Sequence, residues 1–241
     1  IVVAAVPEGL PLIVKLVTKQ NVKTMEKFNI LAKNPGKIPE LAYVDIICTD
    51  KTGTLTTGVM TPKTIIGSNT KEIDMNSKLW NEMKNNIVLN NSSTFDKDGM
   101  ITGGNSIDRA MMSLVNSDEY KNINKNIQML DKQVFSSSNK YSAFTTKDNL
   151  TYYKGAPERI IEKCSFMIDE EGNRKSFTSK DKEAIQNKLR EMTTKSMRCI
   201  ALSSKNEKLE ENKLPEDMSL LGIIGVCLLY TSPSPRDGLL S

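Results

Sequence analysis

A carboxylate suited to phosphorylation stands in the run Cys48-Thr49-Asp50-Lys51-Thr52-Gly53-Thr54-Leu55-Thr56. Asp50 follows an apolar, β-branched segment, so we expect it at the end of a buried strand, where it could attack the γ-phosphorus of ATP. The glycine lets the backbone approach a phosphate closely, and the threonine hydroxyls can bind its oxygens. Magnesium between carboxylate and phosphate would offset their repulsion. The run predicts aspartyl phosphorylation, although its central Asp-Lys-Thr-Gly alone would also fit an ordinary turn.

A second carboxylate, Glu8, lies in Val6-Pro7-Glu8-Gly9-Leu10-Pro11, within the most apolar stretch of the chain. Pro7 has no N–H to give to the carbonyl of Val3, so we expect free carbonyls beside the carboxylate, and together they would form a cation site. An acidic residue inside a membrane costs roughly 2.5–3.5 kcal/mol on insertion scales, so it is seldom there without a function. A proline-kinked helix of a soluble domain is the alternative that this segment leaves open.

Four further segments combine glycine, aromatic and charged residues. Taken singly, each segment fits an ordinary loop, a surface cation or a core aromatic. The segments are Gly104–Ala110 with Asp108, Phe135–Lys140, Lys154-Gly155-Ala156-Pro157-Glu158, and Met197–Leu202 with Arg198.

Taken together and in this order, the segments resemble the P-type ATPases, membrane ion pumps that phosphorylate themselves on aspartate. The carrying motifs are PEGLP, DKTGTLT and KGAPE, and the resemblance extends from about Ile1 to Val226. It implies a haloacid-dehalogenase-like phosphorylation domain, only part of which is in the chain, with an inserted α+β nucleotide-binding domain. PEGLP resembles calcium pumps more than sodium–potassium pumps, so calcium is the favoured ion.

The resemblance also implies a role for each matching residue. Asp50, Lys51 and Thr52 would carry out phosphoryl transfer, with Asp50 and Thr52 holding Mg²⁺. ATP would lie against Asp108, Phe135, Lys140, Lys154, Gly155 and Arg198. The transported cation would lie against Glu8 and the carbonyls of Val3, Ala4 and Val6. Asp108 stands where the family usually carries a glutamate that meets the adenine.

The composition limits which partners, catalytic groups and metal ligands the chain can have. The chain has 33 Lys+Arg against 29 Asp+Glu and no block of like charge, so we expect no nucleic-acid partner. It contains 0 histidines, which excludes histidine acid–base catalysis and histidine metal ligands within it. Its 4 cysteines stand far apart, as is typical of reduced core cysteines.

Helical and strand patterns suggest how these residues are positioned. Ile1–Ala32 is expected to form one long helix that begins as part of a membrane span and continues with lysines on the cytoplasmic side. Tyr43–Cys48 is expected to be a buried parallel strand that delivers Asp50 to the edge of an α/β sheet. Leu220–Val226 would be a second buried strand that pairs beside it.

The inserted domain is expected to contain helices over Ser77–Leu89, from Asn105 or Ser106 to Leu114, after Pro157, and from the Thr178–Asp181 capping box onward. Expected strands are Gln128–Phe135, Tyr141–Thr146, Leu150–Tyr153 and Arg198–Ser203, with a charged loop over Lys205–Lys213.

The expected fold is therefore α/β, with a partial transmembrane helix at 1–33, the first part of the phosphorylation domain at 34–59, the nucleotide-binding domain at 60–215, and a return strand at 216–226. The tail 227–241 has no periodicity and is expected to be foreign or disordered. The parent protein would reside in a membrane, with a bacterial plasma membrane as the favoured guess, and residues after about 20 would be cytoplasmic. This chain alone is expected to bind ATP without turning it over. A soluble phosphatase or phosphotransferase and a non-catalytic ATP-binding module are the rival functions.

Overall fold

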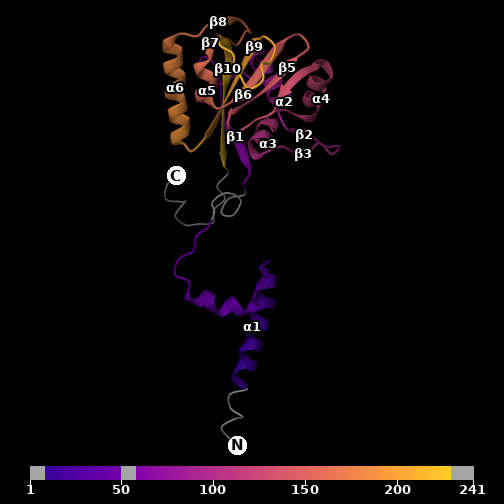
Figure 1. Ribbon diagram of the computed structural model, residues 1–241, viewed down its shortest axis with the longest axis vertical. Coiled ribbons are helices and arrows are strands. Elements are labelled where there is room, and N and C mark those ends of the chain that lie inside the picture. Colours follow the sequence, from indigo (N-terminus) through magenta and orange to yellow (C-terminus); the bar gives the residue numbers. More distant parts are fainter. Residues whose placement is uncertain (1–8, 50–57, 229–241) are drawn as a thin grey trace, which may run out of the picture. The chain divides into compact units, whose positions relative to one another are not determined.

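A computed structural model describes residues 9–49 and 58–228. The chain divides into two compact units, Ile1–Thr49 and Asp50–Ser241, and the second holds the sheet (Figure 1). Seven residues of the expected phosphorylation and cation sites lie outside the described residues: Asp50, Lys51, Thr52, Val3, Ala4, Val6 and Glu8.

In residues 9–49, the first unit consists of the helix α1 (Gly9–Lys27) and the 3-10 helix η2 (Pro35–Tyr43). The helix expected over Ile1–Ala32 ends earlier, because Asn29 adopts the left-handed conformation with φ 59°. The N–H of Ile30 donates to Met25 O and that of Asn29 to Glu26 O, both at 3.0 Å, which closes the helix end. No helix in 9–49 or 58–228 is both long and apolar enough to cross a membrane.

The buried strand expected over Tyr43–Cys48 is not observed. Tyr43 ends η2, the residues after it are irregular, and Ile46 and Ile47 are each 81% exposed. A strand is stable beside neighbours that take its backbone hydrogen bonds, and the described part of this unit offers no second strand. The strand prediction is therefore wrong for this segment, and Cys48 is an exposed rather than a core cysteine.

The second unit is built on an 8-stranded sheet of order β4-β5-β6-β9-β10-β7-β8, with β1 also paired to β10. A hairpin of two further strands stands apart from it. The strands are β1 (Met60–Gly67), β2 (Ser93–Phe95), β3 (Ile101–Gly103), β4 (Met129–Gln133), β5 (Tyr141–Thr146), β6 (Leu150–Gly155), β7 (Cys164–Ile168), β8 (Arg174–Ser176), β9 (Arg198–Asn206) and β10 (Met218–Leu228).

The strand β10 corrects one expectation about strand pairing. One edge of β10 pairs with β9, while the other pairs with β7 at its start and then with β1, in the register Met60↔Leu228 to Gly67↔Gly222. Leu220–Val226 thus lies inside this sheet, where strands of the same unit take its hydrogen bonds on both edges. The prediction that it pairs beside a strand ending at Asp50 is wrong.

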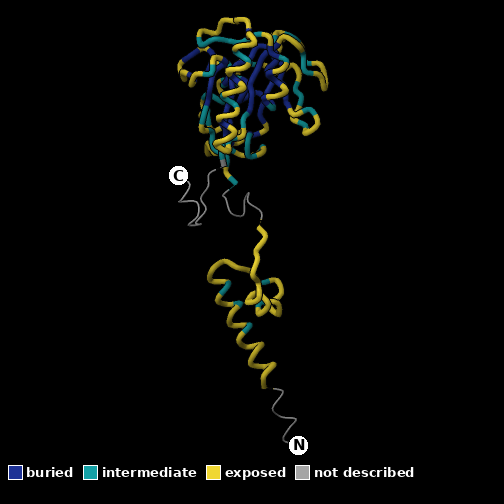
Figure 2. The backbone as a smooth tube through the Cα atoms, turned by 90° about the vertical axis from the view of Figure 1, so that its left-hand side faces the viewer, coloured by how far each residue is buried: buried dark blue, intermediate teal, exposed yellow. Residues whose placement is uncertain are grey.

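Helices cover both faces of the sheet, as the ribbon shows (Figure 1). They are α2 (Lys78–Leu89), α3 (Ser106–Met112), α4 (Ser117–Asn126), α5 (Pro157–Glu162) and α6 (Ser179–Thr194). One hydrophobic cluster joins α2 and α3 to strand residues such as Tyr152, and a second joins α5 and α6 to the alternate residues, such as Tyr153. The strands β5, β6, β9 and β10 are consequently mostly buried, and buried backbone fills the interior of the second unit (Figure 2). This alternation is the period of two that a sheet covered on both faces requires.

Capping residues and a proline in the sequence mark where several of these helices begin. The helix expected over Ser77–Leu89 is α2, and Ser77 proves to be its N-cap. Asn105 caps α3 and Pro157 opens α5, as expected. The predicted capping box of Thr178 and Asp181 at the start of α6 is confirmed. The strand expected over Gln128–Phe135 is shorter, and β9 extends to Asn206, into the segment expected to be a loop.

Two buried asparagines, Asn86 in α2 and Asn90 at its C-cap, fix this helix over the strands that carry the site. The amide of Asn86 donates to Tyr153 O at 3.0 Å and Ser203 O at 3.2 Å. One turn later, the amide of Asn90 donates to Ser142 O at 2.9 Å. Because each bond joins α2 to a strand backbone, the helix cannot slide along the sheet without leaving buried amides unpaired.

Candidate nucleotide-binding site

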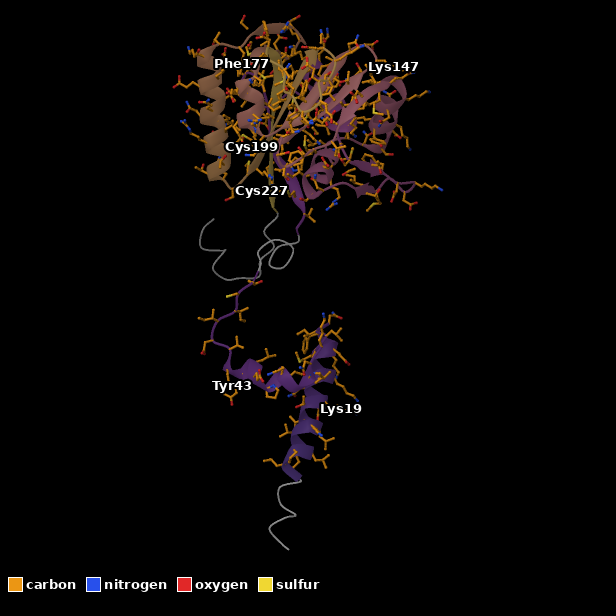
Figure 3. The ribbon with its side chains drawn as sticks, in the orientation of Figure 1. Lys19, Tyr43, Lys147, Phe177, Cys199 and Cys227 are labelled. Atoms are coloured by element: carbon orange, nitrogen blue, oxygen red, sulfur yellow. The ribbon has the colours of Figure 1, made fainter. Side chains whose placement is uncertain are left out.

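One cavity of the second unit, of about 600 Å³, is lined by all the residues that the sequence suggested for a nucleotide. Strand register explains the convergence, because Gly155 of β6 pairs with Tyr141 of β5 and with Ala201 of β9. Cys199 of β9, labelled in Figure 3, lines the same cavity. The predicted residues that line it are Asp108 from α3, Phe135 and Lys140 from the loop after β4, Lys154 and Gly155 from β6, and Arg198 from β9.

Gly155 stands where no side chain fits. A Cβ at this position would lie 2.6 Å from the carbonyl oxygen of Lys140 and 2.7 Å from the Cβ of Tyr141. The same Lys140 oxygen accepts the N–H of Ala156 at 3.0 Å, so the crowded backbone is held in place. The glycine therefore allows the loop before β5 to lie directly against the end of β6 at the cavity wall.

Replacing Gly155 with alanine is expected to lower the free energy of unfolding by about 1–3 kcal/mol, the usual range for overpacking, because backbone must shift to admit the methyl group. The same shift would weaken nucleotide binding. Urea titration followed by the fluorescence of Trp80, which is 4% exposed, measures the first effect. The control is Gly67→Ala, whose Cβ would meet the flexible end of Leu79 at 3.2 Å. Equal stability of the two variants would contradict the account.

A buried ion pair forms part of the cavity wall. Lys154 Nζ lies 2.7 Å from Asp108 Oδ1, and the two side chains are 8% and 9% exposed. The amide of Asn105 donates to Asp108 Oδ2 at 3.1 Å, so donors of the protein engage both carboxylate oxygens. Burial lowers the pKa of Lys154, and the charge of Asp108 opposes this shift. Buried charges persist when they are paired in this way, and the pair fixes the Lys154 ammonium at the wall.

The remaining side chains are open to solvent and to a ligand. Phe135 is 49% exposed, although an aromatic ring usually gains from burial. Lys140 Nζ and Glu158 Oε1 lie 3.8 Å apart in an exposed ion pair, and Arg198 is exposed at the start of β9. This arrangement places an accessible ring and cations around one hollow, which suits a planar base joined to phosphates.

One contributor was missed as a site residue. Asn105 was expected only to cap α3, yet its amide also fixes the Asp108 carboxylate. The signal was present in the spacing, since a cap and an acidic residue three positions later is the pattern of a capping box. Across 9–49 and 58–228, no group of three or more cysteine, aspartate and glutamate side chains is arranged to hold a metal ion.

Comparison with known proteins agrees with this architecture. The family described as "P-type ATPase, cytoplasmic domain N" matches residues 79–227. A putative calcium-transporting ATPase 13, plasma membrane-type, of Arabidopsis thaliana is 29% identical over 94% of this chain and 24% of its own length. Calcium-transporting ATPase 1 of Bacillus cereus is 26% identical over 93% of this chain and 26% of its own length.

Calcium-transporting ATPase 1 of Saccharomyces cerevisiae is 28% identical over 93% of this chain and 27% of its own length. The chain thus spans about a quarter of the length of the curated relatives it matches. Its mixed α/β sheet with helices on both faces agrees with a nucleotide-binding domain of this family. Because the family match covers more than half of its residues, the chain belongs to the P-type ATPases, through their cytoplasmic domain N.

Proposed function

We propose that the cavity binds ATP. The observation that carries the proposal is that one hollow of about 600 Å³ joins an accessible ring, Phe135, to the cations Lys140, Lys154 and Arg198. Small-molecule sites commonly have volumes of roughly 300–1,000 Å³ and combine apolar walls with a few fixed polar groups.

Each side chain has a distinct part in the proposed complex. The ring of Phe135 stacks on the base, and the absence of a side chain at Gly155 lets the nucleotide pass the backbone. Lys140 and Arg198 are exposed and meet the phosphates as charged donors. Lys154 is held by Asp108, so its ammonium is oriented before the ligand arrives and loses little freedom on binding.

The replacement Phe135→Ala tests this proposal. Stacking of a base on an aromatic ring is worth about 1–3 kcal/mol, so ATP should bind roughly 5- to 150-fold more weakly to the variant. Isothermal titration of the 241-residue chain with ATP measures the effect. Stability should be nearly unchanged, because the ring is 49% exposed.

The matched control for this variant is Phe28→Ala. Phe28 lies in the first unit, is 72% exposed and is not among the residues that line the cavity, so its removal deletes a ring of the same size without changing the cavity lining. ATP affinity should be unchanged in this control. Equal affinities of Phe135→Ala and the unaltered chain would overturn the proposed stacking.

For the whole protein, we propose that the bound ATP phosphorylates Asp50. A carboxylate oxygen of Asp50 attacks the γ-phosphorus, the bond to the β-phosphate oxygen breaks, and ADP leaves. Lys51 and Thr52 assist this transfer within the phosphorylation domain of haloacid-dehalogenase type. The Asp50 carboxylate and the Thr52 hydroxyl are hard oxygen donors of the kind that Mg²⁺ prefers, and the ion would neutralise charge between carboxylate and phosphate.

We further propose that phosphorylation drives a cation across a membrane, with calcium as the favoured ion. Support comes from the relatives, which are named calcium-transporting ATPases, and from the segment around Glu8. The Glu8 carboxylate and the carbonyls of Val3, Ala4 and Val6 are oxygen ligands, the type that calcium takes. The match to domain N favours this function over the soluble phosphatase that the sequence also allowed.

A further inference from the structure

Lys132 lies outside the sequence motifs, yet its hydrogen bonds lead through Asn91 to Asp108 of the candidate site. It belongs to β4, where it pairs with Phe144 of β5, and its side chain is half-buried. It lines a second cavity of about 500 Å³ together with Lys147 and is not among the residues that line the nucleotide cavity. A lysine is rarely withdrawn from water without a partner, so its contacts explain its position.

Those contacts lead directly to Asp108. Lys132 Nζ donates to the carbonyl oxygen of Asn91 at 2.9 Å. The side-chain amide of Asn91 in turn donates to the carbonyl oxygen of Asp108 at 3.1 Å, and its Oδ1 accepts the N–H of Ser93 at 2.8 Å. Asn91 is 7% exposed, so this relay runs through the interior. Lys132 therefore fixes the backbone from which the Asp108 carboxylate projects.

Electrostatic interactions link Lys132 to both Asp108 and Lys154. The Asp108 carboxylate attracts Lys132 and so opposes the effect of burial, which lowers the pKa of Lys132. Lys132 also repels Lys154 and thereby adds to the lowering of the pKa of Lys154. Two lysines thus share one carboxylate, and their cluster carries a net positive charge, whereas Lys154 and Asp108 alone would be neutral.

We propose that Lys132 is a positioning residue of the nucleotide site: it holds Asp108 through Asn91, and it leaves the buried cluster positively charged toward the phosphates. This inference rests on the proposed binding of ATP in the cavity. Lys132 does not touch the ligand and acts through the residues that do.

The test compares Lys132→Met with Lys147→Met in the 241-residue chain. Both variants remove one positive charge from a residue that lines the second cavity, but Lys147 is exposed and makes none of the contacts to Asn91 and Asp108. Figure 3 labels Lys147 on the second unit. Affinities for ATP and for adenosine are measured by titration calorimetry, because only ATP carries phosphate charge. Thermal unfolding verifies that each variant is folded.

In Lys132→Met, ATP should bind about tenfold more weakly, while adenosine affinity should change by less than about twofold, since a charge acts on the phosphates. Lys132→Arg should recover most of the ATP affinity, and Lys147→Met should bind both ligands normally. Equal weakening for both ligands, or an unchanged ATP affinity in Lys132→Met, would overturn the inference alone. Failure of the unaltered chain to bind ATP would overturn the proposed function and this inference with it.

Discussion

Replacing Lys154 with methionine is expected to lower the free energy of unfolding by about 3–5 kcal/mol and to remove measurable ATP binding. The ammonium lies 2.7 Å from Asp108 Oδ1, and both side chains are less than a tenth exposed. Methionine fills a similar volume but leaves the buried carboxylate without its ion-pair partner. Urea titration gives the stability, and calorimetric titration with ATP gives the affinity.

Removing the other partner should be more damaging still. In Asp108→Leu, the cluster keeps Lys132 and Lys154 without a counter-ion, whereas Lys154→Met keeps a carboxylate near one lysine. Combining the two substitutions should restore part of the lost stability, because replacing a buried ion pair by apolar side chains is often nearly neutral. ATP binding should stay lost in the double variant. Full additivity of the two stability losses would contradict the pairing.

The pH dependence of Asp108→Leu has a definite sign. Burial lowers the pKa of Lys154 in the folded domain, and the opposing charge of Asp108 is gone in this variant. The folded domain then binds this proton more weakly than the unfolded chain, whose lysines have pKa values of about 10.4. Stability should therefore rise with pH from the folded pKa up to about that value. Urea titrations at neutral and at mildly alkaline pH measure the slope, which should be steeper than in the unaltered chain.

Lys140→Met is the matched control for this series. Lys140 lines the same cavity, but its ion pair with Glu158 has a separation of 3.8 Å and side chains that are 56% and 66% exposed. Exposed pairs contribute about 0–1 kcal/mol, so its stability should be close to that of the unaltered chain. A loss as large as that of Lys154→Met would show that burial is not the reason for the effect.

Replacing Asp50 with asparagine in the whole protein is expected to abolish the phosphoenzyme and ion transport completely. Asparagine has nearly the same shape but lacks the anionic oxygen that attacks phosphorus, so the acyl phosphate cannot form. ATP binding should persist, because the cavity is formed by residues 105–200. The measurement is incubation with ATP labelled at the γ-phosphate, acid quench, and treatment of the label with hydroxylamine.

Asp45→Asn supplies the control for that experiment, since Asp45 is an exposed carboxylate five positions earlier. It should form the phosphoenzyme normally. An acid-stable, hydroxylamine-sensitive label in Asp50→Asn would contradict the assignment of Asp50. Full biological activity of Asp50→Asn would instead favour an ATP-binding module without catalysis.

The sequence predicted the helix starts that depend only on residues close together in the chain. The Thr178–Asp181 box, the Asn105 cap and Pro157 each act within one helical turn, and each begins a helix where expected. The helix α4 was missed because its segment SDEYKNINKN is mostly polar and offers few apolar residues, of which Tyr120 and Ile123 pack against the hydrophobic clusters. The strands β2, β3 and β8 were missed because three-residue strands carry too little periodicity, and the five-residue β7 that pairs with β8 was missed with it.

Contacts between residues far apart in the sequence could be predicted only in part. The residues of the cavity could be proposed from motifs, but the pairing of Asp108 with Lys154 joins positions 46 residues apart and needs the folded sheet. Lys132 has no local signal at all, since its partner Asn91 is 41 residues away. The strand β10 was assigned to the wrong neighbours because an apolar run predicts burial without specifying which strands pair.

The central claim is that ATP occupies the cavity between α3, β6 and β9, and photochemical labelling tests it most directly. The 241-residue chain is irradiated with a photoreactive azido-ATP, with and without excess ATP, and the labelled peptides are identified by mass spectrometry. We predict adducts on residues that line the cavity, around Phe135, Gly155 and Cys199, and we predict that ATP protects them. ATP-protected adducts confined to another part of the chain, such as the cavity that Lys147 lines, would contradict the account.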